Sequence, residues 1–123
     1  MAAREVVVVS GARTAIGDYG AALKDVPATQ LGSIAIREAV ARAKIDAATV
    51  GHVVLGSVVH GEARDMYISR VAAVEAGIPV GTPCLTVNRL CGSGQEAILS
   101  GARMILTDIV APHDAAPRLA TPG

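Results

Sequence analysis

The sequence predicts an α/β fold in which helices cover a mainly parallel sheet, and three observations lead to this prediction. Short β-branched runs alternate along the chain with segments whose apolar residues recur at the helical period. The chain is 51% hydrophobic and 18% charged, so it can bury a packed core and wholesale disorder is not expected. Phe and Trp are absent and only two Tyr occur, so Val, Ile, Leu and Ala must build that core.

The first predicted strand is the run at residues 6–9, four consecutive valines of the kind found in strands that are buried on both faces. A loop that contains Gly17, Gly20 and Pro27 follows it. Thr29 is then the expected N-cap of a helix that continues to about Lys44. The spacing i, i+3, i+4, i+7 places four apolar residues on one face of this helix: Ile36, Ala39, Val40 and Ala43.

Two further strand–helix pairs are predicted along the chain. The second strand is expected at residues 52–59, and a short helix at residues 68–76, ended by Gly77 and then Pro79. The third strand is expected at residues 84–90 and the last helix at residues 95–106. This alternation implies right-handed crossovers between parallel strands.

The pattern changes after Thr107. Residues 108–110 are compatible with the start of a fourth strand, but three prolines follow in an Ala-rich polar segment. We therefore expect residues 1–110 to form one partial domain, truncated before its fourth strand. Residues 111–123 are expected to be a disordered Pro/Ala-rich tail.

Composition excludes several classes of function. Eleven basic residues balance eleven acidic ones without a basic stripe, so nucleic-acid binding is not expected. No stretch approaches the roughly 18 apolar residues of a membrane span, so no membrane association is expected. Cys84 and Cys91 form no CxxC motif and have no pair of histidines nearby, so neither a metal site nor a disulfide framework is indicated. A reducing, cytoplasmic setting is the expectation.

Cys91 is the candidate for chemistry, because it lies between the third predicted strand and the last helix. Catalytic groups gather at the carboxyl ends of parallel strands. Gly92 and Gly94 are expected to shape the turn and to let a substrate approach the backbone, with Ser93 as a possible helix cap. Free amide groups at the helix start would favour a thiolate. The alternative is that Cys91 is a small buried hydrophobe, which is the reading preferred for Cys84.

Several segments resemble one family. Residues 88–94 read Asn-Arg-Leu-Cys-Gly-Ser-Gly and continue Gln-Glu-Ala-Ile, which is similar to the active-site segment of the thiolase family. Residues 7–17, 51–58 and 65–73 resemble the first strand and loop, the second strand and the second helix of the family. The resemblance covers about residues 4–106 in order, and it favours the reactive reading of Cys91.

The resemblance implies an acyltransferase that moves an acyl group between coenzyme A thioesters. In the family the cysteine at the position of Cys91 attacks an acyl-CoA and becomes an acyl-enzyme. The reaction is acetyl-CoA C-acetylation or, in reverse, thiolysis of a 3-ketoacyl-CoA in fatty acid metabolism. The resemblance implies acyl-CoA substrates, no resident cofactor and a homo-oligomer. Asn88 and Arg89 are expected to hold the turn, and Met66, Tyr67 and Arg70 to face either a partner subunit, solvent or the core.

Two family motifs do not occur in the sequence, the Gly-His-Pro that carries the activating histidine and the Cys-x-Gly-Gly-Gly that carries a second cysteine. None of His52, His60 and His113 is followed by Pro, and only His60, at the end of a strand, is a candidate for a site contact. No CoA-binding residue is assigned. We therefore expect a truncated or frame-shifted chain that is inactive alone, with residues 6–9 as an unprotected sheet edge. The alternatives are a non-catalytic remnant that only associates, with itself or with an intact thiolase, and a fragment of a ketoacyl-synthase-like enzyme.

Overall fold

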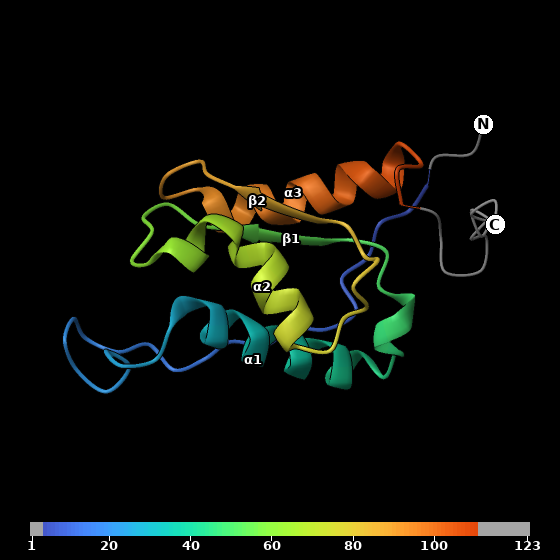
Figure 1. The fold of residues 1–123 in the computed structure, drawn as a ribbon. Coiled ribbons are helices and arrows are strands. Elements are labelled where there is room, and N and C mark those ends of the chain that lie inside the picture. The colour runs from blue at the N-terminus through green and yellow to red at the C-terminus, as the bar shows by residue number, and fades with distance from the viewer. Residues whose placement is uncertain (1–3, 111–123) are drawn as a thin grey trace.

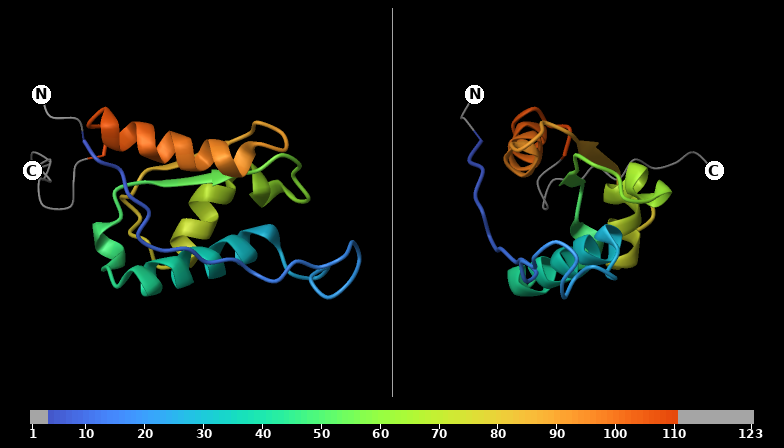
Figure 2. Two further views of the ribbon diagram at one scale, coloured as in Figure 1. Left: turned by 180° about the vertical axis from the view of Figure 1, so that it is seen from behind. Right: turned by 90° about the vertical axis from the view of Figure 1, so that its left-hand side faces the viewer.

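The computed structural model describes residues 4–110. Its helices, short 3₁₀ helices and strands are α1 (Ala28–Ala43), η1 (Ala47–Thr49), β1 (Val53–Gly56), η2 (Ala63–Tyr67), α2 (Ile68–Glu75), β2 (Cys84–Val87) and α3 (Ser93–Leu106). The two strands run parallel, with Val53 opposite Cys84 and Gly56 opposite Val87. One face of this sheet carries α3, and the other carries α2 with α1 packed against it (Figure 1, Figure 2). The predicted α/β class, with parallel strands and covering helices, is confirmed.

The helix α1 lies within two residues of its predicted range. Ile36 and Val40 from its predicted apolar face pack against the core cluster of Val53, Ala73 and Ile78. The predicted cap is wrong, because Pro27 precedes the helix and Thr29 lies buried inside the first turn. The Thr29 side chain is therefore buried and does not cap the helix.

Small side chains let α1 and α2 approach closely. Ala72 is fully buried, and a Cβ on Gly32 would lie only 3.1 Å from the Cβ of Ala72. The hydroxyl of Thr86 on β2 donates to the Ser69 hydroxyl at 2.7 Å and accepts the Ser69 amide at 3.3 Å, so polar groups buried in this layer are satisfied. Small residues therefore hold these layers close together.

The end of α2 follows the predicted order of glycine and then proline. Gly77 adopts φ +91°, which a residue with a Cβ rarely does. Its amide donates to the Val74 carbonyl at 3.0 Å, and the Ile78 amide donates to the Ala73 carbonyl at 3.0 Å. These two bonds form a Schellman motif, and the motif brings Ile78 back into the core.

The predicted first strand is wrong. Within residues 4–110, the valines at 6–9 pair with no strand, and Val8 is 85% exposed. The segment is tied beside the fold, because Arg4 pairs with Asp108 and the Ser10 hydroxyl donates to the Ala39 carbonyl at 2.7 Å. The segment runs past the sheet and α3 (Figure 2, blue). Together with residues of β1 and α3 it lines a groove of about 540 Å³. A β-branched run favours strand geometry, but a strand forms only where a neighbour accepts its hydrogen bonds.

Residues 108–110, which the sequence left compatible with the start of a fourth strand, do not form one in the structure. Asp108 adopts φ +59°, and the amides of Ile109 and Val110 donate to the Met104 carbonyl at 3.0 and 3.2 Å. The free carbonyls in the last turn of α3 capture these amides, so the segment caps the helix and does not extend. The predicted tail, residues 111–123, lies outside the described residues.

Enlarging Ala72 tests the close packing of α1 on α2. We expect Ala72→Leu to lower the free energy of unfolding by about 1–3 kcal/mol, because the added carbons have no space opposite Gly32. Urea unfolding of the purified chain measures this. Ala41→Leu is the matched control, since Ala41 lies exposed on α1 and should tolerate the same enlargement. Equal stabilities of the two variants would contradict the packing argument.

Candidate active site

The segment that joins β2 to α3 carries Cys91. Because β1 and β2 are parallel, the loops that follow them leave the sheet at the same end (Figure 1). Cys91 is exposed in this segment, after the end of β2 at Val87 and before the start of α3 at Ser93. The sulfur is therefore open to solvent at the edge of the sheet where the sequence placed it.

Two polar side chains hold the backbone on either side of Cys91. The Asn88 side-chain oxygen accepts the Leu90 amide at 3.0 Å. The hydroxyl of Ser93 accepts the Arg89 amide at 2.8 Å and donates to the Leu90 carbonyl at 2.7 Å. Asn88 thus has the structural role expected of it. Ser93 is not the helix cap that was predicted, because it is the first residue of α3 and bonds back to the turn.

The strained residue of the turn is Leu90 and not a glycine. Leu90 adopts φ +48°, a left-handed conformation that costs a residue with a Cβ about 1–2 kcal/mol. Neither Gly92 nor Gly94 has a positive φ, so the prediction that these glycines make the turn possible is wrong. A Cβ on Gly94 would meet nothing within 4 Å. Gly94 therefore leaves open space beside the start of α3.

Gly56, which the sequence analysis did not single out, is the glycine that the site requires. A Cβ at this position would lie 2.6 Å from both the carbonyl carbon and the carbonyl oxygen of Ser93. It would also lie 3.0 Å from the Gly94 nitrogen. The end of β1 therefore touches the backbone of the first turn of α3. A glycine inside a run of valines is the signal that could have revealed this contact.

The first turn of α3 offers free amide groups. Its first helical bond runs from the Glu96 amide to the Gly92 carbonyl at 2.9 Å. The amides of Gly94 and Gln95 donate to no acceptor in the part of the chain that the structure describes. Free amides and the helix dipole make this end of α3 favourable for negative charge.

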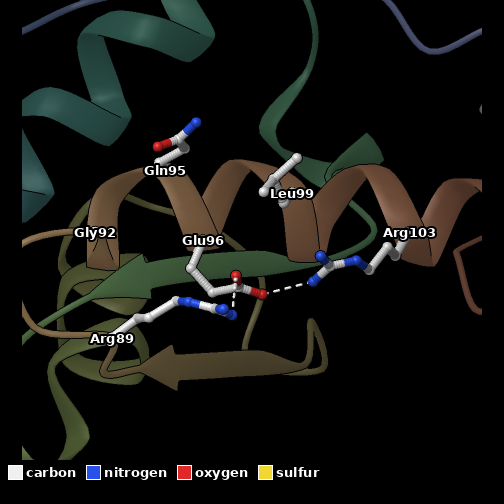
Figure 3. A pocket seen from close by; sticks show the side chains of 6 residues that line it. All are labelled: Arg89, Gly92, Gln95, Glu96, Leu99 and Arg103. Atoms are coloured by element: carbon white, nitrogen blue, oxygen red, sulfur yellow. Dashed lines mark hydrogen bonds and ion pairs between the residues drawn. The ribbon is translucent and has the colours of Figure 1, made fainter.

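A cavity of about 310 Å³ lies beside the same helix start (Figure 3). It is lined by Arg89, Gly92, Gln95, Glu96, Leu99 and Arg103. The Glu96 carboxylate, 15% exposed, accepts from Arg103 at 2.5 Å and from Arg89 at 3.0 Å. The hydrogen bond from Arg103, assisted by the positive charges of both arginines, lowers the pKa of Glu96 below its ordinary value of 4.5 against an opposing desolvation. This ion-pair cluster joins the turn to the body of α3.

The remaining candidates form no hydrogen bond with Cys91 among residues 4–110. Cys84 packs against the core cluster, as expected. His52 is half-buried at the start of β1, and His60 is exposed in the loop that follows this strand. His113 lies outside the described residues. Within residues 4–110, no three His, Cys, Asp or Glu side chains gather in a way that could hold a metal ion.

The three residues expected at a partner, solvent or core contact divide into two kinds. Met66 and Tyr67 are exposed. Arg70 donates to the carbonyls of Val80 and Thr82 at 2.5 and 3.0 Å, so its charge fastens the loop before β2. No helix among residues 4–110 has the length and apolar character that crossing a bilayer requires.

Neutralising Glu96 tests the ion-pair cluster. A carboxylate whose pKa is lowered by folding stabilises the fold above its ordinary value, and this contribution is lost as the pH falls below 4.5. We expect Glu96→Gln to lower the urea midpoint at about pH 7 and to lower it less at about pH 3, because the folded-state pKa of Glu96 lies below 4.5. Glu38→Gln is the control, because it removes only an exposed pair with Arg42 and should change little. An equal loss at both pH values would argue against the cluster.

Comparison with known proteins places these features in a family. The family described as "Thiolase, N-terminal domain" matches residues 6–110. The beta-ketothiolase BktB of Cupriavidus necator is 59% identical over 103 residues, which are 84% of this chain and 26% of BktB. The mitochondrial 3-ketoacyl-CoA thiolase of Homo sapiens is 41% identical over 102 residues, 83% of this chain and 26% of that protein. The chain thus spans about a quarter of the length of these relatives.

Solved structures agree with this match. The human mitochondrial 3-ketoacyl-CoA thiolase in complex with CoA aligns with a TM-score of 0.81 at 39% identity, over 84% of this chain and 26% of the other. The acetyl-CoA acetyltransferase of Bacillus anthracis aligns with a TM-score of 0.83 at 33% identity, over 89% of this chain and 27% of the other. The fold, the matched segment and these similarities agree, and the chain belongs to the thiolase family, with its match in the N-terminal domain of that family.

Proposed function

We propose that this chain supplies the nucleophile of a thiolase-type acyltransferase and that Cys91 accepts the acyl group. The observation that carries the proposal is the place of Cys91 in a member of this family. Its sulfur is exposed at the carboxyl end of the sheet, directly before a helix start whose amides are free. The relatives are named as thiolases and acetyl-CoA acetyltransferases, and this favours the thiolase reaction over that of a ketoacyl synthase.

The proposed step is an exchange of thioesters. The Cys91 sulfur, after losing its proton, attacks the carbonyl carbon of an acyl-CoA, and a new carbon–sulfur bond forms. The bond from that carbon to the coenzyme A sulfur breaks, and the departing thiolate takes up a proton to give free coenzyme A. No oxidant, reductant or resident cofactor is needed. A second acyl-CoA would then accept the acyl group to give a 3-ketoacyl-CoA.

The second half of the reaction needs a base at the α carbon. Among residues 4–110, no histidine forms a hydrogen bond with Cys91. Since the chain spans about a quarter of its relatives, we propose that it forms the acyl-enzyme but does not complete the condensation alone. We also propose acyl-CoA as the substrate and a homo-oligomer as the assembly. The cytoplasmic setting stays a prediction, because relatives of the chain include proteins named as mitochondrial.

Intact mass measurement tests the proposed nucleophile. On incubation with acetyl-CoA, we expect the chain to gain the mass of one acetyl group, without sustained release of acetoacetyl-CoA. Cys91→Ala should abolish the adduct. Cys84→Ala is the matched control and should retain it, because Cys84 packs against the core. An adduct that survives in Cys91→Ala, or no adduct in the parent chain, would overturn the assignment.

A second candidate function is association without catalysis. The observation that favours it is the row of exposed valines at residues 6–9 beside the apolar groove. A β-branched segment without a strand partner is a site where a second copy of the chain could pair.

Sedimentation at increasing concentration distinguishes this candidate. If association is the function, the chain should dimerise and Val8→Lys should weaken the dimer at least about tenfold, because a charge would enter the groove. Val80→Lys is the control, since Val80 is similarly exposed but lies before β2. A monomer at all concentrations that still forms the acetyl adduct would exclude association as the chain's function.

A further inference from the structure

We infer that Gly56 and Ser93 are positioning residues that set where the Cys91 sulfur lies relative to the start of α3. The inference rests on the proposed role of Cys91 as nucleophile and adds to it. Neither residue needs to touch a substrate. Both act through the backbone of the segment that carries the sulfur.

Gly56 sets the distance between β1 and α3. A Cβ at position 56 would lie 2.6 Å from the backbone carbonyl carbon and oxygen of Ser93. These atoms cannot rotate away as the end of a side chain would. Any side chain at position 56 would therefore displace the first turn of α3 from the strand. Cys91 lies two residues before Ser93, so the displacement would move the sulfur as well.

Ser93 is the residue of α3 that Gly56 contacts, and its side chain fixes the shape of the turn before the helix. Its side chain is buried, with only 5% of the residue exposed, and its hydroxyl makes two hydrogen bonds that reach into the turn. One of them holds the carbonyl of Leu90, the residue in the left-handed conformation. Without the hydroxyl, the Arg89 amide loses its acceptor, and the Leu90 carbonyl keeps only the backbone amide of Ser93 at 3.0 Å. The strained conformation of Leu90 is then held less firmly. The residue after Leu90 is Cys91.

Gly56 and Ser93 both affect where the Cys91 sulfur lies relative to the free amides of α3. The free amides of Gly94 and Gln95 belong to the helix turn that Gly56 locates, whereas the Cys91 sulfur belongs to the turn that Ser93 shapes. A displacement of about 1 Å between a reacting group and its surroundings can cost about 100-fold in rate. We therefore expect Gly56→Ala and Ser93→Ala each to slow acetyl transfer to Cys91 at least about tenfold.

The experiment compares each variant with a matched control on α3. Gly101→Ala adds the same methyl group where nothing lies within 4 Å. Ser100→Ala removes a hydroxyl that bonds only the Glu96 carboxylate. Each protein is first compared by circular dichroism, and rates are taken only from folded chains. Two rates are measured, the formation of the acetyl adduct from acetyl-CoA and the alkylation of Cys91 by iodoacetamide as a function of pH. Every variant also carries Cys84→Ala, so that Cys91 is the only cysteine that iodoacetamide can alkylate.

Slow acylation and a pH profile of alkylation moved to higher pH in both test variants, with unchanged controls, are the expected results. A loss of stability alone would not move the pH profile of the folded chains. Parent-like rates and profiles in folded Gly56→Ala and Ser93→Ala would overturn the inference. So would the loss of the fold in both variants, since the two residues would then serve general stability. If Gly56→Ala alone fails to fold, Ser93→Ala decides, because it only removes one oxygen atom.

Failure of the proposed function gives a different result. A parent chain that forms no acetyl adduct removes the acyltransferase assignment, but alkylation still reports on the position of the sulfur. A shifted alkylation profile in the two variants would then support positioning without acyl transfer. An unshifted alkylation profile would refute both the acyltransferase assignment and the positioning roles of Gly56 and Ser93.

Discussion

The contact of β1 with the first turn of α3 determines the geometry of this end of the molecule. It is a contact of backbone with backbone, and it exists because residue 56 has no side chain. Contacts of this kind are rigid, since no rotamer change can absorb a displacement. The start of α3 is located by this point on the strand, and the turn that carries Cys91 joins the helix there.

The opposite face of β1 follows a similar principle. There Gly32 and Ala72 allow α1 and α2 to approach each other and the sheet, and the hydroxyls of Thr86 and Ser69 satisfy one another within the layer. Small side chains on both sides keep the layers thin. A thin, close-packed scaffold gives little freedom to the loops that emerge from it, which suits a site whose reactive atom must be held in place.

The site is well defined on the side of the nucleophile and open on the other. Local hydrogen bonds from Asn88 and Ser93 hold the strained Leu90, so the sulfur is located by residues within a few positions of it. The valines at residues 6–9 are tied at both ends but cover a groove without filling it. A nucleophile can be held by one short segment, whereas a base and a substrate site need groups from distant parts of a chain. Such a division is consistent with a chain that spans about a quarter of its relatives.

The sequence by itself determined the features that depend on neighbours along the chain. Helical spacing located α1 and α3 within two residues of their observed ends, the order of Gly77 and Pro79 predicted the end of α2, and the strand–Cys–helix pattern placed Cys91. Hydrogen bonds within a few residues and the helical period decide these features, so they can be recognised in a linear string. The tertiary structure alone decided that residues 6–9 stay unpaired, that Leu90 carries the strain of the turn, and that Gly56 meets Ser93. Each of these features depends on which distant segments of the chain pack against one another. The residue pattern of one segment does not say how close another segment will lie.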